Sequence, residues 1–326
     1  MARQLHGGDL DAAIERFGGE PAGWLDLSTG INPTAWPLPE LGADAWTRLP
    51  GQGALRRLND VAREFYRVHD ANRVAAAAGA QQLIQMLPDM AGTGRAGTMG
   101  PTYNEYRNRF EMAGFEVETF AEMGDLAGLQ LAAVVNPNNP DGRRHAPDAL
   151  LELARHVGLL IVDEAFGETS PELSLCGRPL PENVVVLRSF GKFFGLAGVR
   201  LGFAVSHVEA VGALADRLGP WPVSGPALEI GSAAMSDMAW IEATRRRLAA
   251  DMIRLRRMLE AAGFDIVGGT DLFVTVASDA ARTWHETLAR SQILVRRFPD
   301  RPDWLRFGLP DREADWDRLS QLLKAG

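Results

Sequence analysis

A single lysine stands inside a segment rich in glycine and aromatic residues, S-F-G-K-F-F-G-L-A-G-V-R-L-G, which runs from Ser189 to Gly202. An amine in such surroundings is costly unless it is neutralised, paired or used covalently. Ser189 and Arg200, on either side of Lys192, offer a hydroxyl and a planar fork of donors, and both groups suit a phosphate. The glycines between them let the backbone come close to a bound group. The segment therefore predicts an amine held beside a bound phosphate.

Pyridoxal 5′-phosphate matches these requirements, because it needs an amine for its aldehyde and an anchor for its phosphate. The pattern S-x-x-K alone fits a surface lysine beside a buried strand about equally well. The rest of the chain has to decide between these two interpretations.

Further polar groups come directly after apolar runs that predict strands. N-P-N-N-P-D-G, which contains Asn139, follows one run, and D-E-A-F, which begins at Asp163, follows another. Gly79-Ala80-Gln81 follows a third run and opens a helix, where free amides and the helix dipole favour a phosphate. An acid such as Asp163 can keep a pyridine nitrogen protonated, Asn139 can donate to a phenolate oxygen, and Tyr103 can stack on the ring. Taken singly, each residue also fits a helix cap, a turn or core packing.

These groups need a sheet to hold them, and the central chain alternates apolar runs with helical patterns. Strands are predicted at 24–27, 74–78, 96–99, 115–120, 131–135, 159–162, 184–187, 201–205, 272–276, 293–295 and 305–307. Helices are predicted from Asp9 to Gly18, over 54–67, from Gly79, from Pro101, after a capping box at 206–209, over 240–262, and after Asp311. Such alternation predicts an α/β fold with a mainly parallel sheet wrapped by helices, whose ligands bind beyond the carboxyl ends of the strands.

The same pattern predicts a division of the chain. Residues 1–35 form an N-terminal arm that packs with a small domain, and 36–221 form a large α/β domain. Residues 222–326 supply a long connecting helix and the small C-terminal α+β domain.

Composition narrows the class of protein. The formal net charge of −8 gives no general affinity for nucleic acid, and arginines 245–247 are expected on a solvated helix face. Cys176 is the only cysteine, which excludes an intrachain disulfide and makes a cysteine-based metal site implausible, so no metal is expected. The N-terminus lacks the apolar core of a signal peptide, and apolar runs fall short of a membrane span. We expect a soluble cytoplasmic protein that binds neither nucleic acid nor membrane.

Several segments carry a resemblance to a known family over nearly the whole chain. N-P-N-N-P-D-G, V-D-E-A-F and the lysine segment resemble the signatures of fold type I pyridoxal-phosphate enzymes of the aminotransferase class I and II superfamily. P-T-Y-N-E-Y at 101–106 narrows the resemblance to the branch of histidinol-phosphate aminotransferases. Within that branch the chain is most similar to decarboxylases of cobalamin biosynthesis that act on L-threonine O-3-phosphate. That similarity is carried by H-G-G at 6–8, L-D-L-S-T-G-I-N-P at 25–33, D-E-A-F at 163–166, P-W-P-V-S at 220–224 and I-L-V-R at 293–296.

The resemblance implies a function and a set of site residues. The implied reaction is decarboxylation of L-threonine O-3-phosphate to 1-aminopropan-2-ol O-2-phosphate, by a homodimer that uses pyridoxal phosphate. The alternative is transamination of histidinol phosphate or a related amino acid. Lys192 would supply the amine for the cofactor, Asp163 would pair with the pyridine nitrogen and Asn139 with the phenolate oxygen. The other implied cofactor residues are Gly79, Ala80, Gln81, Tyr103, Ser189 and Arg200. The implied substrate residues are His6, Gly7, Asn32 and Arg296 at the phosphate and Arg306 at the carboxylate.

The chain departs from the family pattern at three places. Phe166 stands where aminotransferases usually have a tyrosine, as it does in the decarboxylases, and Asp141 replaces a threonine in a turn. Leu49-Pro50-Gly51 replaces a Y-P-D segment whose tyrosine reaches the cofactor phosphate of the neighbouring subunit, a contact for which Gln52 or Arg48 could substitute. A non-catalytic regulator with this fold would need a basic DNA-binding part, and the chain has neither the length nor the charge for one.

Overall fold

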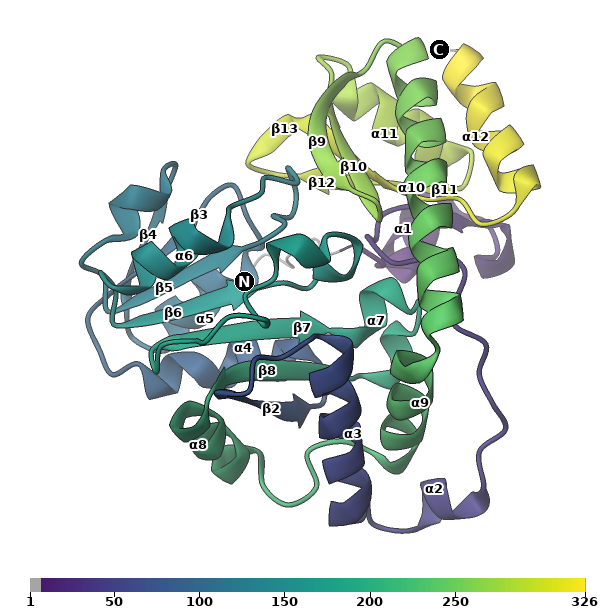
Figure 1. Cartoon of the computed structure of the whole chain (residues 1–326). Coiled ribbons are helices and arrows are strands. Elements are labelled where there is room, and N and C mark those ends of the chain that lie inside the picture. The colour runs from purple at the N-terminus through teal and green to yellow at the C-terminus, as the bar shows by residue number, and fades with distance from the viewer. Residues whose placement is uncertain (1–6, 326) are drawn as a thin grey trace. The chain divides into compact units, whose positions relative to one another are not determined.

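The computed structural model describes residues 7–325 of the chain (Figure 1). Contacts between Cα atoms divide it into two compact units. The large unit comprises residues 35–139 and 143–242, and the small unit comprises the segment up to Thr34, Pro140–Gly142 and the chain from Ala243 onward. The boundary predicted after residue 221 therefore differs from this division. Residues 222–242 group with the large unit because α9 (Gly225–Ser236) packs on α3 (Gln52–Phe65).

The large unit is built on a seven-stranded sheet with the order β2-β8-β7-β6-β5-β3-β4. Its strands are β2 (Asn72–Ala77), β3 (Arg95–Met99), β4 (Glu116–Phe120), β5 (Leu131–Val135), β6 (Leu159–Asp163), β7 (Val184–Ser189) and β8 (Gly202–His207). Only β8 runs antiparallel to its two neighbours. The predicted α/β fold with a mainly parallel sheet is confirmed.

The central strands are buried along their length, which is why they read as continuous apolar runs. Helices supply the other side of the core, and Leu83, Tyr106 and Phe110 are fully buried in one cluster with Leu131 and Ile161. The remaining helices of this unit are α2 (Ala43–Thr47), α4 (Ala80–Met86), α5 (Glu105–Met112), α6 (Pro147–Ala154), α7 (Phe190–Phe193) and α8 (Val208–Leu218).

The small unit combines two sheets with helices. A four-stranded antiparallel sheet has the order β12-β13-β10-β9, and a two-stranded parallel sheet joins β1 to β11. Their bounds are β1 (Leu25–Asp26), β9 (Asp265–Thr270), β10 (Phe273–Ala277), β11 (Ile293–Leu294), β12 (Arg296–Phe298) and β13 (Arg301–Gly308). The helices are α1 (Leu10–Phe17), α11 (Ala281–Arg290), α12 (Glu313–Ala325) and α10 (Met238–Ala261), which begins in the large unit.

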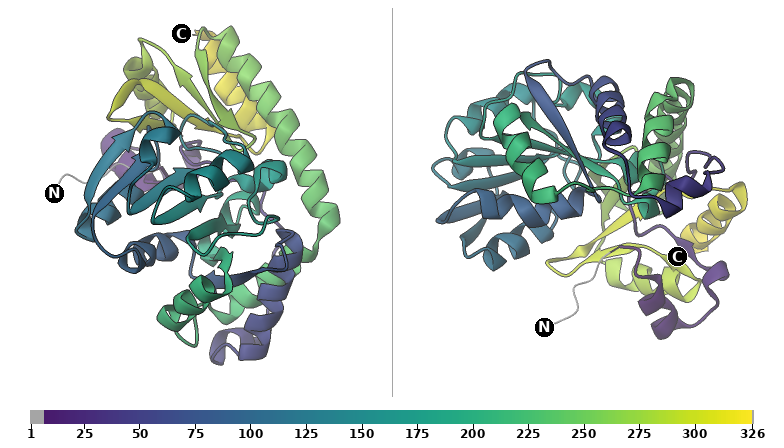
Figure 2. Two further views of the ribbon diagram at one scale, coloured as in Figure 1. Left: turned by 60° about the vertical axis from the view of Figure 1, so that its left-hand side comes forward. Right: turned by 90° about the horizontal axis from the view of Figure 1, so that it is seen from below.

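Helices α10 and α12 lie side by side in the small unit, as Figures 1 and 2 show. The Arg254 guanidinium donates to both carboxylate oxygens of Glu313 at 2.7 and 2.8 Å and lies 4.4 Å from the ring centroid of Trp316. Short 3-10 helices occur at Pro21–Gly23, Leu87–Met90, Met123–Leu126, Gly167–Thr169, Pro171–Leu173 and Ala197–Val199. None of the helices described in residues 7–325 combines the length and apolar character needed to cross a bilayer.

Two predicted helix starts are wrong, each for a local reason. The helix predicted from Pro101 begins at Glu105, because Asn138 holds the preceding turn: its Oδ1 accepts from Thr102 Oγ1 at 2.7 Å and its Nδ2 donates to the Pro101 carbonyl at 2.8 Å. The capping box at 206–209 does not form. Ser206 remains in β8, where its hydroxyl donates to the carbonyl of Val184, so α8 begins at Val208.

Candidate active site

The carboxyl ends of β5, β6 and β7 meet at one edge of the large sheet, since these strands run parallel. Asp163 is the last residue of β6, Ser189 is the last residue of β7, and Lys192 lies in α7 immediately afterwards. Asn139 lies in the loop that follows β5, and the amide N–H of Asn136 in that loop donates to the Asp163 carbonyl at 2.8 Å. The edge therefore gathers an amine, a carboxylate, a hydroxyl and a carboxamide from separate parts of the chain.

Asp163 is held by two hydrogen bonds from within the large unit. It is only 5% exposed, and burial raises the pKa of its carboxyl group, while the hydrogen bond from Tyr106, the amide of Ala165 and the charge of Lys192 act in the opposite direction. The hydroxyl of Tyr106 donates to Asp163 Oδ2 at 2.8 Å, and the Ala165 N–H donates to Oδ1 at 2.9 Å. A buried carboxylate held in this way is suited to pair with a protonated ring nitrogen.

Several groups that could bind a phosphate lie close together near the Gly202 end of β8. Gly79 adopts φ of +86°, which favours glycine, and a Cβ at this position would lie 2.7 Å from Nη2 of Arg200. A Cβ on Gly202 would run into the backbone nitrogen of Ala80. Ser189 pairs directly with Gly202, because β8 is antiparallel and starts at the edge where β7 ends. Backbone amides, a guanidinium and a hydroxyl thus approach one region, as anchoring a phosphate requires.

Gln81 of α4 and Tyr103, in the loop before α5, lie close to each other. The Tyr103 hydroxyl donates to Gln81 Oε1 at 3.2 Å, and Gln81 Nε2 donates to Glu105 Oε2 at 2.9 Å. The Tyr103 ring meets that of Tyr106 at a centroid distance of 6.4 Å. Since the side chain of Gln81 serves this bridge, its contribution to a bound phosphate would come through the backbone.

Phe166 is 4% exposed, and the Nζ atom of Lys192 lies 5.9 Å from its ring centroid. A phenylalanine here packs beside the amine without offering a hydroxyl.

Gln52 and Arg48 could substitute for the missing tyrosine of the Y-P-D segment, and both make contacts within the chain. Gln52 Nε2 donates to the Pro220 carbonyl at 2.7 Å, and Arg48 pairs with Asp44 at 3.2 Å.

The small unit carries a second set of predicted residues, centred on two arginines. Arg296 of β12 and Arg306 of β13 are cross-strand partners. Arg306 is 6% exposed, its Nη2 donates to the Ser28 carbonyl at 2.7 Å, and burial followed by the charge of Arg296 lowers its pKa to about 9. Gly7 lies beside it, because a Cβ on Gly7 would be 2.5 Å from the Ser28 carbonyl oxygen and 3.6 Å from Arg306 Nη2. This concentration of positive charge suits an anionic ligand.

Asn32, also in the small unit, is 2% exposed. Its Oδ1 accepts from Arg247 Nη2 at 2.6 Å and from the Thr34 N–H at 3.1 Å, which assigns that end of the amide as oxygen. Arg247 was expected on a solvated face together with residues 245 and 246. Its side chain is 33% exposed and also pairs with Asp251 at 3.2 Å, so the prediction holds only in part for Arg247. His6 lies outside the described residues.

A buried cluster of charged side chains joins β7 to the segment that follows β6. Arg188 of β7 pairs with Glu164 at 2.6 Å and with Glu168 at 3.0 Å, and all three side chains are at most 3% exposed. Ser174 Oγ and the Leu175 N–H also donate to Glu164, at 2.6 and 2.7 Å. The cluster ties the segment after β6 to β7, the two strands that end in Asp163 and Ser189.

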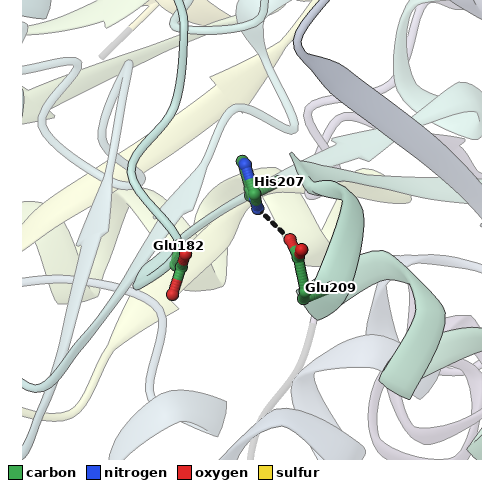
Figure 3. Close-up of side chains that lie close together, drawn as sticks. All are labelled: Glu182, His207 and Glu209. Atoms are coloured by element: carbon green, nitrogen blue, oxygen red, sulfur yellow. Dashed lines mark ion pairs between the residues drawn. The ribbon is translucent and has the colours of Figure 1, made fainter.

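Another group of potential ligand atoms lies at the opposite end of β8. Those of Glu182, His207 and Glu209 lie within 4.8 Å of one another, and His207 forms an ion pair with Glu209 (Figure 3). Both carboxylates are exposed. The group is a surface ion pair with a neighbouring acid and lies away from the Gly202 end of β8, where the candidate site is.

The class of protein follows from this fold and site. Residues 43–319 match the family described as aminotransferase class I and II, and the chain belongs to that family. It is therefore a pyridoxal 5′-phosphate-dependent enzyme.

Particular relatives narrow the comparison. The chain is 43% identical over 330 residues to a threonine-phosphate decarboxylase from Sinorhizobium sp, covering 98% of this chain and 97% of that protein. It is 42% identical over 325 residues to a threonine-phosphate decarboxylase from Pseudomonas aeruginosa, covering 98% and 96%. Among solved structures, histidinol-phosphate aminotransferase from Sinorhizobium meliloti in complex with pyridoxal-5′-phosphate superposes with a TM-score of 0.82 at 21% identity, covering 99% of this chain and 96% of that one.

The sequence analysis did not predict three groups that contact or support the candidate site residues: Tyr106, Arg247 and the Arg188 cluster. In the sequence Arg188 directly follows the strand predicted at 184–187, and Arg247 belongs to a run of basic helix residues. The family segment P-T-Y-N-E-Y contains Tyr106 and was the one available signal for it.

Proposed function

We propose that the enzyme decarboxylates L-threonine O-3-phosphate to 1-aminopropan-2-ol O-2-phosphate and carbon dioxide, a reaction of cobalamin biosynthesis. The proposal is supported by relatives of this name that match 98% of the chain at 42–43% identity. The single geometric observation that carries it is the opposition of Arg296 and Arg306. A substrate with both a phosphate and a carboxylate offers two anionic groups, and two adjacent guanidinium groups can bind both.

Each site residue has a proposed task. Gly79, Ala80, Gln81, Ser189 and Arg200 would hold the phosphate of the cofactor, and Tyr103 would stack on its ring. When bound, pyridoxal phosphate supplies an aldehyde that joins an amine and a protonated ring that draws electrons from the α-carbon. Asp163 would keep the ring nitrogen protonated, and Asn139 would donate to the phenolate oxygen. Lys192 would hold the cofactor between turnovers.

The substrate residues would decide which bond breaks. Arg296, Asn32, Gly7 and His6 would hold the substrate phosphate, and Arg306 would hold its carboxylate. Holding the phosphate end would orient the α-carboxylate out of the plane of the ring, so that the bond between the α-carbon and the carboxylate would be the one to break and carbon dioxide would leave. The Lys192 ammonium group or a water would then deliver a proton to the α-carbon.

The test is to incubate the purified enzyme and pyridoxal phosphate with L-threonine O-3-phosphate, without a 2-oxo acid. We expect release of carbon dioxide and formation of the phosphorylated amino alcohol. A requirement for 2-oxoglutarate, with turnover of histidinol phosphate, would contradict the decarboxylase proposal and favour the aminotransferase alternative.

We also propose that the enzyme works as a homodimer. Trp46, Leu49 and Trp221 are 68%, 70% and 54% exposed, which is unusual for such large apolar side chains. They lie on neighbouring segments of the large unit, because Gln52 donates to the Pro220 carbonyl and α2 packs on α9. A second copy of the chain would cover them. Light scattering should give the mass of a dimer, and Trp46→Glu should shift the measured mass toward that of the monomer.

We further propose that the enzyme is located in the cytoplasm, where phosphorylated metabolites are made and used.

A further inference from the structure

A buried tyrosine touches the acid of the candidate site. Tyr106 lies in α5 and is fully buried, with its ring 6.4 Å from that of Tyr103 and 6.0 Å from that of Phe110. Its hydroxyl donates to Asp163 Oδ2 at 2.8 Å. The other carboxylate oxygen of Asp163 accepts the Ala165 N–H, so both oxygens have a donor from the protein. These two contacts fix the direction in which the carboxylate faces.

The same hydroxyl acts on the charge of Asp163. Burial raises the pKa of this carboxyl group, and the hydrogen bond from Tyr106 is the largest of the influences that lower it. Burial, followed by the charge of Asp163, raises the pKa of Tyr106 well above 10. Tyr106 therefore keeps its proton over the whole working range of pH and always acts as the donor.

We propose that Tyr106 is a positioning residue that keeps Asp163 ionised and aimed at the pyridine nitrogen of the cofactor. The inference rests on the proposed role of Asp163. Nothing in the chemistry requires Tyr106 to touch cofactor or substrate. It acts through the carboxylate, whose attraction for a protonated ring nitrogen depends on its own negative charge.

Tyr106→Phe removes the hydroxyl and leaves the ring, which separates this role from core packing. We expect the affinity of the apoprotein for pyridoxal phosphate to fall about tenfold at neutral pH, because a hydrogen bond to a charged group is lost. Losing a donor raises the pKa of Asp163. The variant should therefore begin to lose affinity for the cofactor at a higher pH than the wild-type protein does as the solution is acidified. Titration of apoprotein by tryptophan fluorescence, across a range of pH, measures both effects.

Tyr66→Phe is the matched control, since it removes a buried phenol elsewhere in the large unit, where the Arg188 guanidinium carbon lies 4.5 Å from the centroid of the Tyr66 ring. Its cofactor affinity and pH profile should equal those of the wild-type protein. Thermal melts of each apoprotein establish that the variants fold. Equal losses in Tyr66→Phe and Tyr106→Phe would overturn the proposal, because a nonspecific effect of removing a phenol would explain both.

A double-mutant cycle with Asp163→Asn separates this inference from the function proposed for Asp163. If Tyr106 acts through the carboxylate, Tyr106→Phe should have little further effect on cofactor affinity in the Asp163→Asn background. If Asp163→Asn weakens cofactor binding and Tyr106→Phe alone does not, the role of Tyr106 is wrong and that of Asp163 stands. If Asp163→Asn leaves the affinity unchanged, the role proposed for Asp163 is wrong as well.

Discussion

Arg296 and Arg306 face each other across adjacent antiparallel strands of the small sheet. Directly opposed residues point their side chains to the same face, so the two positive charges are held close together, and like charges in this position destabilise a sheet. Burial of Arg306 adds to the cost. An anionic ligand relieves both effects, which is a physical reason for placing arginines at these two positions.

Loss of either arginine should therefore weaken binding of a phosphorylated amino acid. We expect Arg306→Gln and Arg296→Gln each to raise KM for L-threonine O-3-phosphate by about 10- to 100-fold, the worth of a charge-assisted hydrogen bond. Arg297→Gln is the matched control, because successive residues of a strand point to opposite faces. Steady-state kinetics measure the change. A comparable rise in KM for Arg297→Gln would indicate a general effect of net charge.

Lys192→Ala should abolish the visible absorption band of the lysine-bound cofactor, because the amine that joins its aldehyde is gone. The spectrum of the protein reconstituted with pyridoxal phosphate measures this directly. Lys192→Arg, which keeps the positive charge near Asp163, should lose the band as well. An unchanged spectrum in either variant would remove Lys192 from its proposed role.

Arg188→Met should destabilise the fold by about 3–5 kcal/mol, since it leaves two buried carboxylates, Glu164 and Glu168, without their cation. Burial raises the pKa of Glu168, so acidification should protonate it more readily and reduce the deficit of the variant relative to the wild-type protein. Urea unfolding at two pH values measures both effects. Arg178→Met breaks an exposed pair with Asp148 and should cost at most about 1 kcal/mol. Equal costs for the two variants would contradict the assignment of a buried cluster.

His285 should make the protein sensitive to acid. Burial, followed by the charges of Arg297 and Arg16, lowers the pKa of this imidazole to about 4, although Glu286 opposes the change. Between pH 6.5 and 4 the unfolded state binds the extra proton, so the free energy of unfolding falls as the pH falls. The loss amounts to about 3 kcal/mol for a shift of this size. His285→Leu should flatten this part of the stability profile. An unaltered slope in His285→Leu would show that other groups cause the acid sensitivity.

Much of the large unit could be predicted, because buried parallel strands appear in the sequence as continuous apolar runs. The run that forms β5 was predicted with its observed bounds, and the polar residues that follow β5, β6 and β7 pointed to Asn139, Asp163 and Lys192. The site edge follows from the rule that ligands bind beyond the carboxyl ends of parallel strands. Two helix starts could not be predicted, because Thr102 and Ser206 form hydrogen bonds with groups that are distant in the sequence.

The sequence by itself determined which chemical groups the enzyme carries and which strand ends display them, because apolar runs and the turns after them are local properties of the chain. Only the tertiary structure decided which groups work as pairs: Tyr106 with Asp163, Arg247 with Asn32, and Arg296 with Arg306. The physical reason is that a hydrogen bond or a cross-strand contact depends on strand register and helix packing. Residues 57 and 215 positions apart, like Tyr106 and Asp163 or Asn32 and Arg247, meet only once the core has set that register.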